Sequence, residues 1–296
     1  MNARLAPGPA AFALMVLLCA VWGFQQVAIK IASAGVGPIL QVGLRSLVAG
    51  VLVFAWIRLR GQTLGSRDGS LVPGLVAGLL FALEFLCIFI GLGHTSASRM
   101  IVFLYTAPCF TVLGLHFFVA GERIGLRHLG GVVLAFGGIA LAFGDESRSG
   151  YWLGDALGLL AAILWAATTV VIRGSALARV SAGKVLLYQL GVSALVTLPL
   201  AALAGEGLPS AAALTAPVLL ALGYQALIVA FASYLAWFWL LTQFLASRLM
   251  VFSFLTPLFG VAFGVALLGE RLSLLFGLAA ALVVAGILLV NIPARK

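Results

Sequence analysis

The sequence predicts an all-α polytopic membrane protein with ten transmembrane helices. Of its 296 residues, 64% are hydrophobic and only 8% are charged, and the mean hydropathy is +1.22. A water-soluble domain carries about 25% charged residues, so a soluble globular protein is excluded. A membrane helix needs about 20 apolar residues. Ten such helices with short loops use nearly the whole chain and leave no stretch for a sizeable water-facing domain.

Five apolar runs separated by short polar breaks form the first half of the chain. The first run is too long for the core of a signal peptide and lacks a small-residue cleavage site, so we expect it to stay in the protein. The break after it is Gly35-Val36-Gly37-Pro38, and later breaks fall at 60–70, 121–127 and 145–150. The predicted spans are 10–32, 38–58, 71–93, 97–120 and 126–144.

Five further runs form the second half. A break at 205–210 separates the second and third of them, and Gly269-Glu270-Arg271 combines a helix stop with a charge pair before the last. The predicted spans are 154–176, 183–204, 213–241, 247–268 and 273–292. The fifth and tenth spans carry almost no polar residues, so we expect them to scaffold the bundle or to form a dimer face.

The basic residues predict that both termini lie in the cytoplasm. If the N-terminus is inside, 12 Lys and Arg residues fall on the cytoplasmic side and 4 on the outer side, with Arg45 inside a span. The net charge of +9 is therefore an orientation signal rather than a nucleic-acid surface. The four outer basic residues are Lys30, Arg99, Arg148 and Arg271, and the outer loops also hold Asp145, Glu146, Asp155, Glu206 and Glu270.

The two halves of the sequence are similar to each other. Residues 98–103 align with 247–252, Thr106-Ala107-Pro108 aligns with Leu255-Thr256-Pro257, and Gly121-Glu122-Arg123 aligns with Gly269-Glu270-Arg271. The repeats predicted are 1–148 and 149–296. Because each holds five spans, the second enters the membrane inverted. Inverted repeats are typical of secondary transporters, which hold substrate near the membrane midplane and work by alternating access.

These motifs give the chain a family resemblance. The Trp-Gly of the first span, the run His94-Thr95-Ser96-Ala97-Ser98, the mid-span prolines and the doubled Gly-Glu-Arg resemble the EamA family of the drug/metabolite transporter superfamily. The resemblance implies a ten-helix carrier of the bacterial inner membrane, of the type that exports aromatic amino acids. It leaves the substrate open.

Glu84, near the middle of the third span, is the first candidate for substrate binding. A carboxylate in the membrane interior is costly and normally faces a cavity or a partner. We hypothesise that Glu84 faces the central cavity and either binds a substrate ammonium group or takes up a proton in exchange. The alternative is a structural ion pair with Arg45. The repeat counterpart of Glu84 is Ser233, so the acid occurs in one half only.

Gln25 and Gln26 are the second candidates. Consecutive residues on a helix point about 100° apart, so one of the two is expected to face the cavity, where an amide can hold a zwitterion. The alternative is interhelical hydrogen bonding, worth about 0.6 kcal/mol on average. Seven mid-span aromatic residues favour an amphipathic substrate over phosphate or sulfate, although packing explains any one of them alone. They are Trp22, Tyr105, Trp165, Tyr188, Tyr234, Trp237 and Trp239.

Pro108 and Pro257 occupy equivalent places in the two repeats. Each removes a backbone hydrogen bond and bends its helix. We predict that they are hinges of a two-state carrier, and the alternative is a static kink. Lys30 and Arg173 are related in the same way, and snorkelling to the membrane interface explains them better than a gate role.

Four classes of function compete for this sequence. The leading one is a secondary exporter of amino acids or similar metabolites, with the lipid bilayer, a small molecule and, as an open alternative, protons as its partners. A drug or nucleobase exporter is the alternative within transport, and a channel fits an inverted repeat less well. Neither an intramembrane enzyme motif nor a nucleotide-binding loop occurs. We expect no cofactor or metal, no nucleic acid, and a monomer or homodimer.

Overall fold

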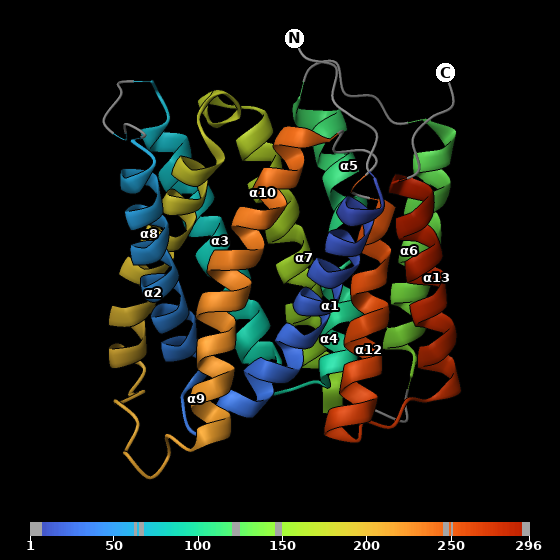
Figure 1. Cartoon of the computed structure of the whole chain (residues 1–296). Helices are drawn as coiled ribbons and strands as arrows, with labels where there is room; N and C mark the ends of the chain where they lie inside the picture. The colour runs from blue at the N-terminus through green and yellow to red at the C-terminus, as the bar shows by residue number, and fades with distance from the viewer. Residues whose placement is uncertain are drawn as a thin grey trace.

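The computed structural model describes residues 8–61, 64, 68–119, 125–145, 150–244, 249 and 251–291. Across these residues the regular structure is helical (Figure 1). Within the described ranges, eight helices are long and apolar enough to cross a membrane, and Phe252–Leu268 and Leu274–Val290 are shorter apolar helices. Each overlaps one predicted span, so the predicted all-α membrane architecture is confirmed at this level.

The described residues of the first half form six helices. Proline in the first turn begins α1 and α2, where the missing N–H group costs no hydrogen bond. The Ser96 hydroxyl caps α4 by accepting a hydrogen bond from the Arg99 N–H at 3.1 Å. The helices are α1 (Pro9–Ala32), α2 (Pro38–Leu59), α3 (Leu71–Gly91), α4 (Ala97–Leu104), α5 (Ala107–Phe118) and α6 (Leu126–Phe143).

The second half has more irregular helices. Its third span changes from α-helix to a ten-residue π-helix and back, and its fourth begins with a 3₁₀ turn. Gly269, at φ +65°, ends α12 as the sequence predicts. The elements are α7 (Trp152–Arg173), η2 (Ala176–Arg179), α8 (Ala182–Leu203), α9 (Ala216–Gly223), η3 (Tyr224–Ser233), α10 (Tyr234–Gln243), η4 (Val251–Phe254), α12 (Leu255–Leu268) and α13 (Leu274–Asn291).

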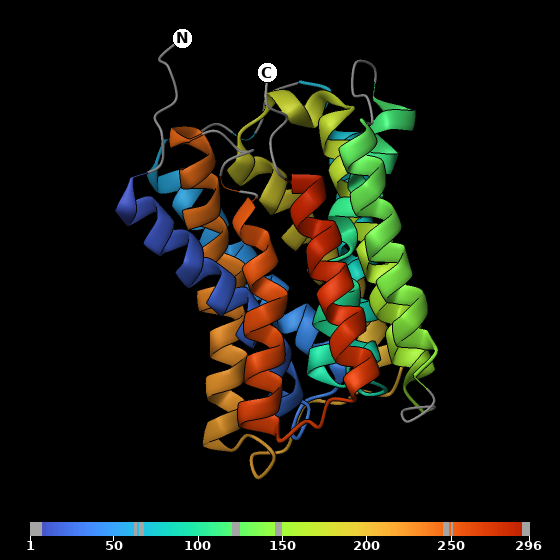
Figure 2. The ribbon, with the colours of Figure 1, turned by 90° about the vertical axis from the view of Figure 1, so that its right-hand side faces the viewer.

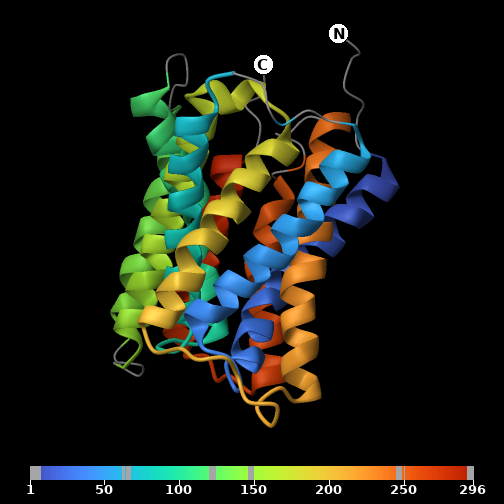
Figure 3. The same cartoon turned by 90° about the vertical axis from the view of Figure 1, so that its left-hand side faces the viewer.

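Most packing joins one half of the chain to the other. Helix α6 packs along α13, α2 along α8, α3 along α7 and α8, and α1 along α12, α9 and η3. Figure 2 shows α6 beside α13, and Figure 3 shows α2 beside α8. Glycine permits the closest approach: a Cβ at Gly131 would lie 2.7 Å from the Gly286 carbonyl oxygen. The fifth and tenth predicted spans thus pack on each other.

The bundle has two ends that differ in their loops. The start of α1 and the end of α13 lie at one end, which we call the terminal side (Figure 1). The opposite end, the distal side, carries the connections 33–37, 92–96, 204–215 and 269–273. Large apolar side chains such as Leu17, Phe117 and Leu219 are exposed on the outer surface of the bundle, as a bilayer environment requires.

Candidate functional site: a central aromatic and charged cluster

Aromatic and charged side chains from both halves meet within the bundle. Tyr105, directly after α4, packs edge-to-face on Trp165 of α7 with the ring centroids 5.5 Å apart. Trp22 of α1 packs in the same way on Trp237 of α10 at 5.9 Å. Each pair joins a residue of the first half to one of the second. The central cluster, as we name it, comprises Trp22, Arg45, Glu84, Tyr105, Trp165, Tyr234 and Trp237.

Tyr105 links the two aromatic pairs to the charged residues. It is buried, and its hydroxyl lies within electrostatic range of Tyr234 and Glu84. Cys19, one helical turn before Trp22, is also in its range. Tyr105, Trp165 and Tyr234 pack in one core beside Glu84 and Arg45. The Trp22–Trp237 pair packs in an adjoining core and is joined to the first by the hydrogen bond from Trp22 to Ser233, the residue before Tyr234.

The repeat relation between Glu84 and Ser233 places a polar group on each side of this neighbourhood. The Trp22 indole N–H donates a hydrogen bond to Ser233 Oγ at 2.9 Å, and Ser233 Oγ donates to the Val229 carbonyl at 2.6 Å. The Ser233 hydroxyl of the second half thus holds the Trp22 ring of the first half in place.

Glu84 and Arg45 are close neighbours without a hydrogen bond between them. Both are buried, at 6% and 2% exposure, and each acts on the other electrostatically. The Arg45 nitrogens nevertheless make no hydrogen bond of good geometry among the described residues. The guanidinium stacks on the Phe85 ring, with Cζ 4.0 Å from the centroid. The side chains are thus adjacent without forming a direct hydrogen-bonded pair.

Gln25 and Gln26 are both buried on α1. The Gln26 Oε1 atom has no hydrogen-bond partner in the described part of the protein. Gly23 brings this part of α1 against α12, since a Cβ there would lie 2.9 Å from the Gly260 nitrogen. Both amide side chains therefore lie in the interior of the bundle, about one helical turn after Trp22.

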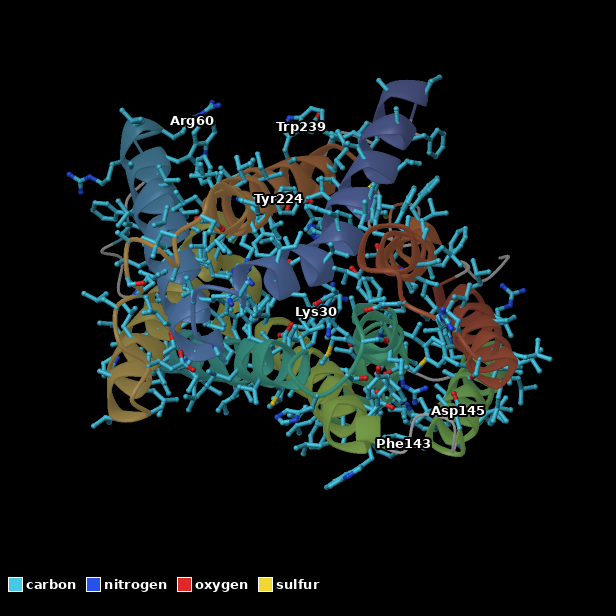
Figure 4. All side chains as sticks on the ribbon, turned by 90° about the horizontal axis from the view of Figure 1, so that it is seen from below. Lys30, Arg60, Phe143, Asp145, Tyr224 and Trp239 are labelled. Carbon is cyan, nitrogen blue, oxygen red and sulfur yellow. The ribbon has the colours of Figure 1, made fainter. Side chains whose placement is uncertain are left out.

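Two predicted aromatic residues lie away from the central cluster. Tyr188 contacts the start of α3, where its hydroxyl is 3.2 Å from Ser70 Oγ and its ring fills the space beside Gly74. Trp239 is 53% exposed, and Figure 4 shows it at the rim of the bundle. We leave both out of the site proposed below.

Three helix interruptions flank the site. A turn at Tyr105 and Thr106 separates α4 from α5 just before Pro108, and η4 precedes α12 just before Pro257. The third interruption is the π-helix η3. Its Gln225 amide donates to Gln41 Oε1 at 3.3 Å and its Tyr224 hydroxyl to the Val21 carbonyl at 2.8 Å. Short π-helical segments occur frequently at functional sites, and no sequence pattern predicts this one.

A buried ionic network, also missed from the sequence, lies at the distal side. Arg99 Nε donates to Asp155 Oδ2 at 2.9 Å, and Nη1 is 3.3 Å from Asp145 Oδ2. The Thr95 hydroxyl donates to Asp155 at 2.6 Å, and that of Ser273 to Asp145 at 2.6 Å. The network joins α4, the end of α6, the start of α7 and the loop before α13.

Two glutamates of the second half cap helices of the first half. Glu206 accepts hydrogen bonds from the N–H groups of Ile39 and Leu40 at the start of α2, at 3.2 and 2.8 Å. Glu270 does the same at the start of α4, where the Ala97 N–H donates at 2.6 Å. A carboxylate is favourable at a helix N-terminus. Glu270 is therefore more than a surface loop charge; its predicted repeat counterpart, Gly121-Glu122-Arg123, lies outside the described residues.

A pocket of about 480 Å³ opens beside these contacts at the distal side. Lys30 borders it, together with Arg99, Asp145, Glu270 and Arg271. Figure 4 views this side and places Lys30 toward the middle of the bundle and Asp145 nearer its edge. Lys30 thus faces a charged pocket, a different surrounding from the predicted lipid interface. Among the described residues no group of three or more His, Cys, Asp or Glu side chains is arranged to hold a metal ion.

Comparison with known proteins agrees with this architecture. The Escherichia coli K12 protein described as "Uncharacterized inner membrane transporter YedA" is 26% identical over 95% of this chain and 90% of its own. A second protein of that strain, "Probable amino-acid metabolite efflux pump", is 26% identical over 93% of this chain and 92% of its own. A solved crystal structure, 22% identical, covers 95% of this chain and 97% of its own with a TM-score of 0.65, which supports the fold.

One family profile matches the chain twice. The EamA-like transporter family matches residues 10–144 and again residues 152–292, so that each half of the chain carries a copy. Together the matches cover nearly the whole sequence. The protein is a membrane transporter and belongs to the EamA-like transporter family.

Proposed function

We propose that this protein is a secondary carrier that exports amino acids or similar small amphipathic metabolites across the inner membrane. The observation that carries the proposal is the central cluster. In it, the buried Glu84 and Arg45 lie beside aromatic rings contributed by both halves of the chain. Such a site offers opposite charges for a polar head and aromatic faces for an apolar side chain.

Alternating access follows from two inverted five-span repeats. The family matches the two halves separately, and the helix packing is consistent with an exchange of the halves. In the repeat, α1 corresponds to α7, α12 to α4 and α5, and η3 to α3. The contact of α1 with α12 thus corresponds to that of α7 with α4 and α5, and the contact of α1 with η3 to that of α7 with α3. Structures related in this way can open to either side by exchanging the conformations of the halves.

The terminal side is proposed to face the cytoplasm. It carries basic residues such as Arg58, Arg60 and Arg179, whereas acidic Asp155, Glu206 and Glu270 lie at the distal side. Positive residues collect in cytoplasmic loops. The inner-membrane description of the relative YedA supports the same location.

Release at the distal side requires the contacts between the halves to break there. Glu206 and Glu270 tie α2 and α4 to the second half, and the Arg99 network adds buried ion pairs. We propose that these contacts close the outer side of the carrier. The interruptions before Pro108 and Pro257 are placed to act as the hinges of opening.

The relative described as an amino-acid metabolite efflux pump favours amino acids as cargo. The test is uptake of labelled amino acids into proteoliposomes loaded with unlabelled amino acid, with and without an imposed pH gradient. Saturable uptake stimulated by internal substrate supports an amino-acid carrier, and a response to the gradient supports proton exchange. No flux of any amino acid contradicts the proposed cargo and favours a drug or nucleobase. Flux that does not saturate contradicts a carrier and favours a channel.

A further inference from the structure

We propose that Arg45 binds the carboxylate group of the transported molecule, so that the carrier selects substrates with a free carboxylate. The inference rests on the proposed function and adds to it the group that recognises the acid end of the substrate. It concerns a residue that the sequence offers only as a structural partner of Glu84.

The first observation is the state of the Arg45 side chain. It is 2% exposed, and Nε, Nη1 and Nη2 make no hydrogen bond of good geometry among the described residues. The Tyr234 hydroxyl lies close to the guanidinium and can accept from one of its five N–H groups, which leaves the others for an incoming ligand. Arginine keeps its charge in proteins and carries five N–H donors. A buried charge with unpaired N–H donors is costly, so these donors are suited to an acceptor that arrives with the substrate.

The second observation is the orientation of the guanidinium plane. Its carbon lies 4.0 Å from the centroid of Phe85 and 5.9 Å from that of Phe89, and both rings belong to α3. Stacking on an aromatic face stabilises the cation through that face. The N–H groups lie in the plane of the guanidinium and remain available for two parallel hydrogen bonds to a carboxylate.

The third observation is the set of groups around Arg45. Glu84 and Tyr234 are the charged and polar neighbours that act on it electrostatically. When Glu84 is ionised, the guanidinium and the carboxylate together carry no net charge, as does a zwitterionic amino acid. Arg45 is therefore placed for the substrate carboxylate, Glu84 for the ammonium group, and the rings of Tyr105 and Trp165 for the side chain.

A structural role for Arg45 makes a different prediction from a binding role. If the residue only offsets the charge of Glu84, its removal changes folding or overall activity equally for all ligands. If it binds the carboxylate, its removal changes the preference between an acid and the matching amide. The preference is therefore the decisive quantity.

The experiment measures ligand-induced thermal stabilisation of the purified protein by two matched pairs, phenylalanine with phenylalaninamide and phenylacetate with phenylacetamide. We expect the wild type to bind each acid about a hundredfold more tightly than its amide, as a charge-assisted hydrogen bond implies. Arg45→Met should bring the ratio near one while amide binding persists. Arg45→Lys should give an intermediate ratio, because lysine keeps the positive charge but cannot donate two parallel hydrogen bonds to one carboxylate.

Arg60→Gln is the control, because Arg60 is exposed at the C-terminal end of the same helix, α2, and stacks on Trp56; it should keep the wild-type ratio. If Arg45→Met does not accumulate as folded protein, Arg45→Gln replaces it. A wild type that binds neither acid, or binds acid and amide equally, overturns the proposal, as does an Arg45 variant with the wild-type ratio. The protein could show no amino-acid flux and still bind phenylacetate more tightly than phenylacetamide in a way that depends on Arg45. That result would refute the proposed cargo and leave the role of Arg45 standing. Amino-acid flux together with an unchanged acid-to-amide ratio in Arg45→Met would support the cargo and refute the role of Arg45.

Discussion

Glu270 holds Ser98 by two hydrogen bonds: its Oε2 atom accepts from the Ser98 N–H at 2.9 Å and from the Ser98 hydroxyl at 2.5 Å. The two residues belong to different halves of the chain and lie 172 positions apart. One side chain therefore caps α4 and joins the halves at the distal side. In the proposed mechanism, this contact breaks when the distal side opens.

Loss of the Glu270 charge should loosen the distal side. Glu270→Gln keeps the size of the side chain but removes the negative charge from the α4 N-terminus, which costs about 1 kcal/mol for a helix cap. We expect a lower Tm in detergent and faster labelling of a cysteine introduced at Ser96 from the distal side. Glu206→Gln should act in the same direction at α2. Unchanged Tm and labelling in both variants would refute a closing role.

A single substitution in the Arg99 network should destabilise the protein more than a double substitution that removes both partners of an ion pair. Removing one partner of a buried ion pair leaves an uncompensated charge and costs about 3–5 kcal/mol, whereas replacing both by apolar residues is often neutral. Arg99→Met should therefore lower the Tm strongly, and Arg99→Met combined with Asp155→Leu should recover part of the loss. Asp145 keeps its hydrogen bond from Ser273 in both variants. A double variant no more stable than Arg99→Met would contradict this account.

The interface between α6 and α13 offers two matched pairs of glycines. A Cβ at Gly131 or Gly138 would lie 2.7 Å from a carbonyl oxygen of α13, whereas Gly130 and Gly137 have open space. Overpacking costs about 1–3 kcal/mol, so Gly131→Ala and Gly138→Ala should lower the Tm. Gly130→Ala and Gly137→Ala are the controls and should leave it unchanged or slightly higher. Equal effects within each pair would mean that the two helices do not pack in this register.

The two prolines should govern turnover rather than binding. Pro108→Ala and Pro257→Ala restore a backbone N–H group at an interruption and so favour a continuous helix. We expect slower exchange in proteoliposomes with nearly unchanged substrate affinity. Turnover at the wild-type rate in both variants would show that the bends are static.

The apolar runs were sufficient to predict the spans because lipid imposes the length and hydropathy of each helix. They also located Glu84 and five aromatic residues that the structure brings together. The direction in which a side chain points around its helix was not predictable in this way. Tyr188 and Trp239 are also aromatic and lie within predicted spans, yet Tyr188 faces the start of α3 and Trp239 the outer surface. A mean hydropathy over a span does not say which face of the helix a residue occupies.

The distal contacts were not predictable from local sequence. Glu206 and Glu270 read as loop charges, and their roles depend on helix starts that lie more than 150 residues away. The sequence places Arg99 among the basic residues of the outer loops, whereas its burial against Asp155 is a tertiary contact. The π-helix at 224–233 is likewise supported by contacts with α1 and α2 and has no turn residue to mark it.

The most direct test of the central claim is counterflow of labelled amino acid in proteoliposomes that carry the wild type or Glu84→Gln. Trp239→Leu is the control, because that ring is exposed at the rim of the bundle. We predict saturable counterflow for the wild type and Trp239→Leu, and at least a tenfold loss for Glu84→Gln as folded protein, about the effect of one charge-assisted hydrogen bond. Wild-type counterflow in Glu84→Gln would contradict the central cluster as the substrate site.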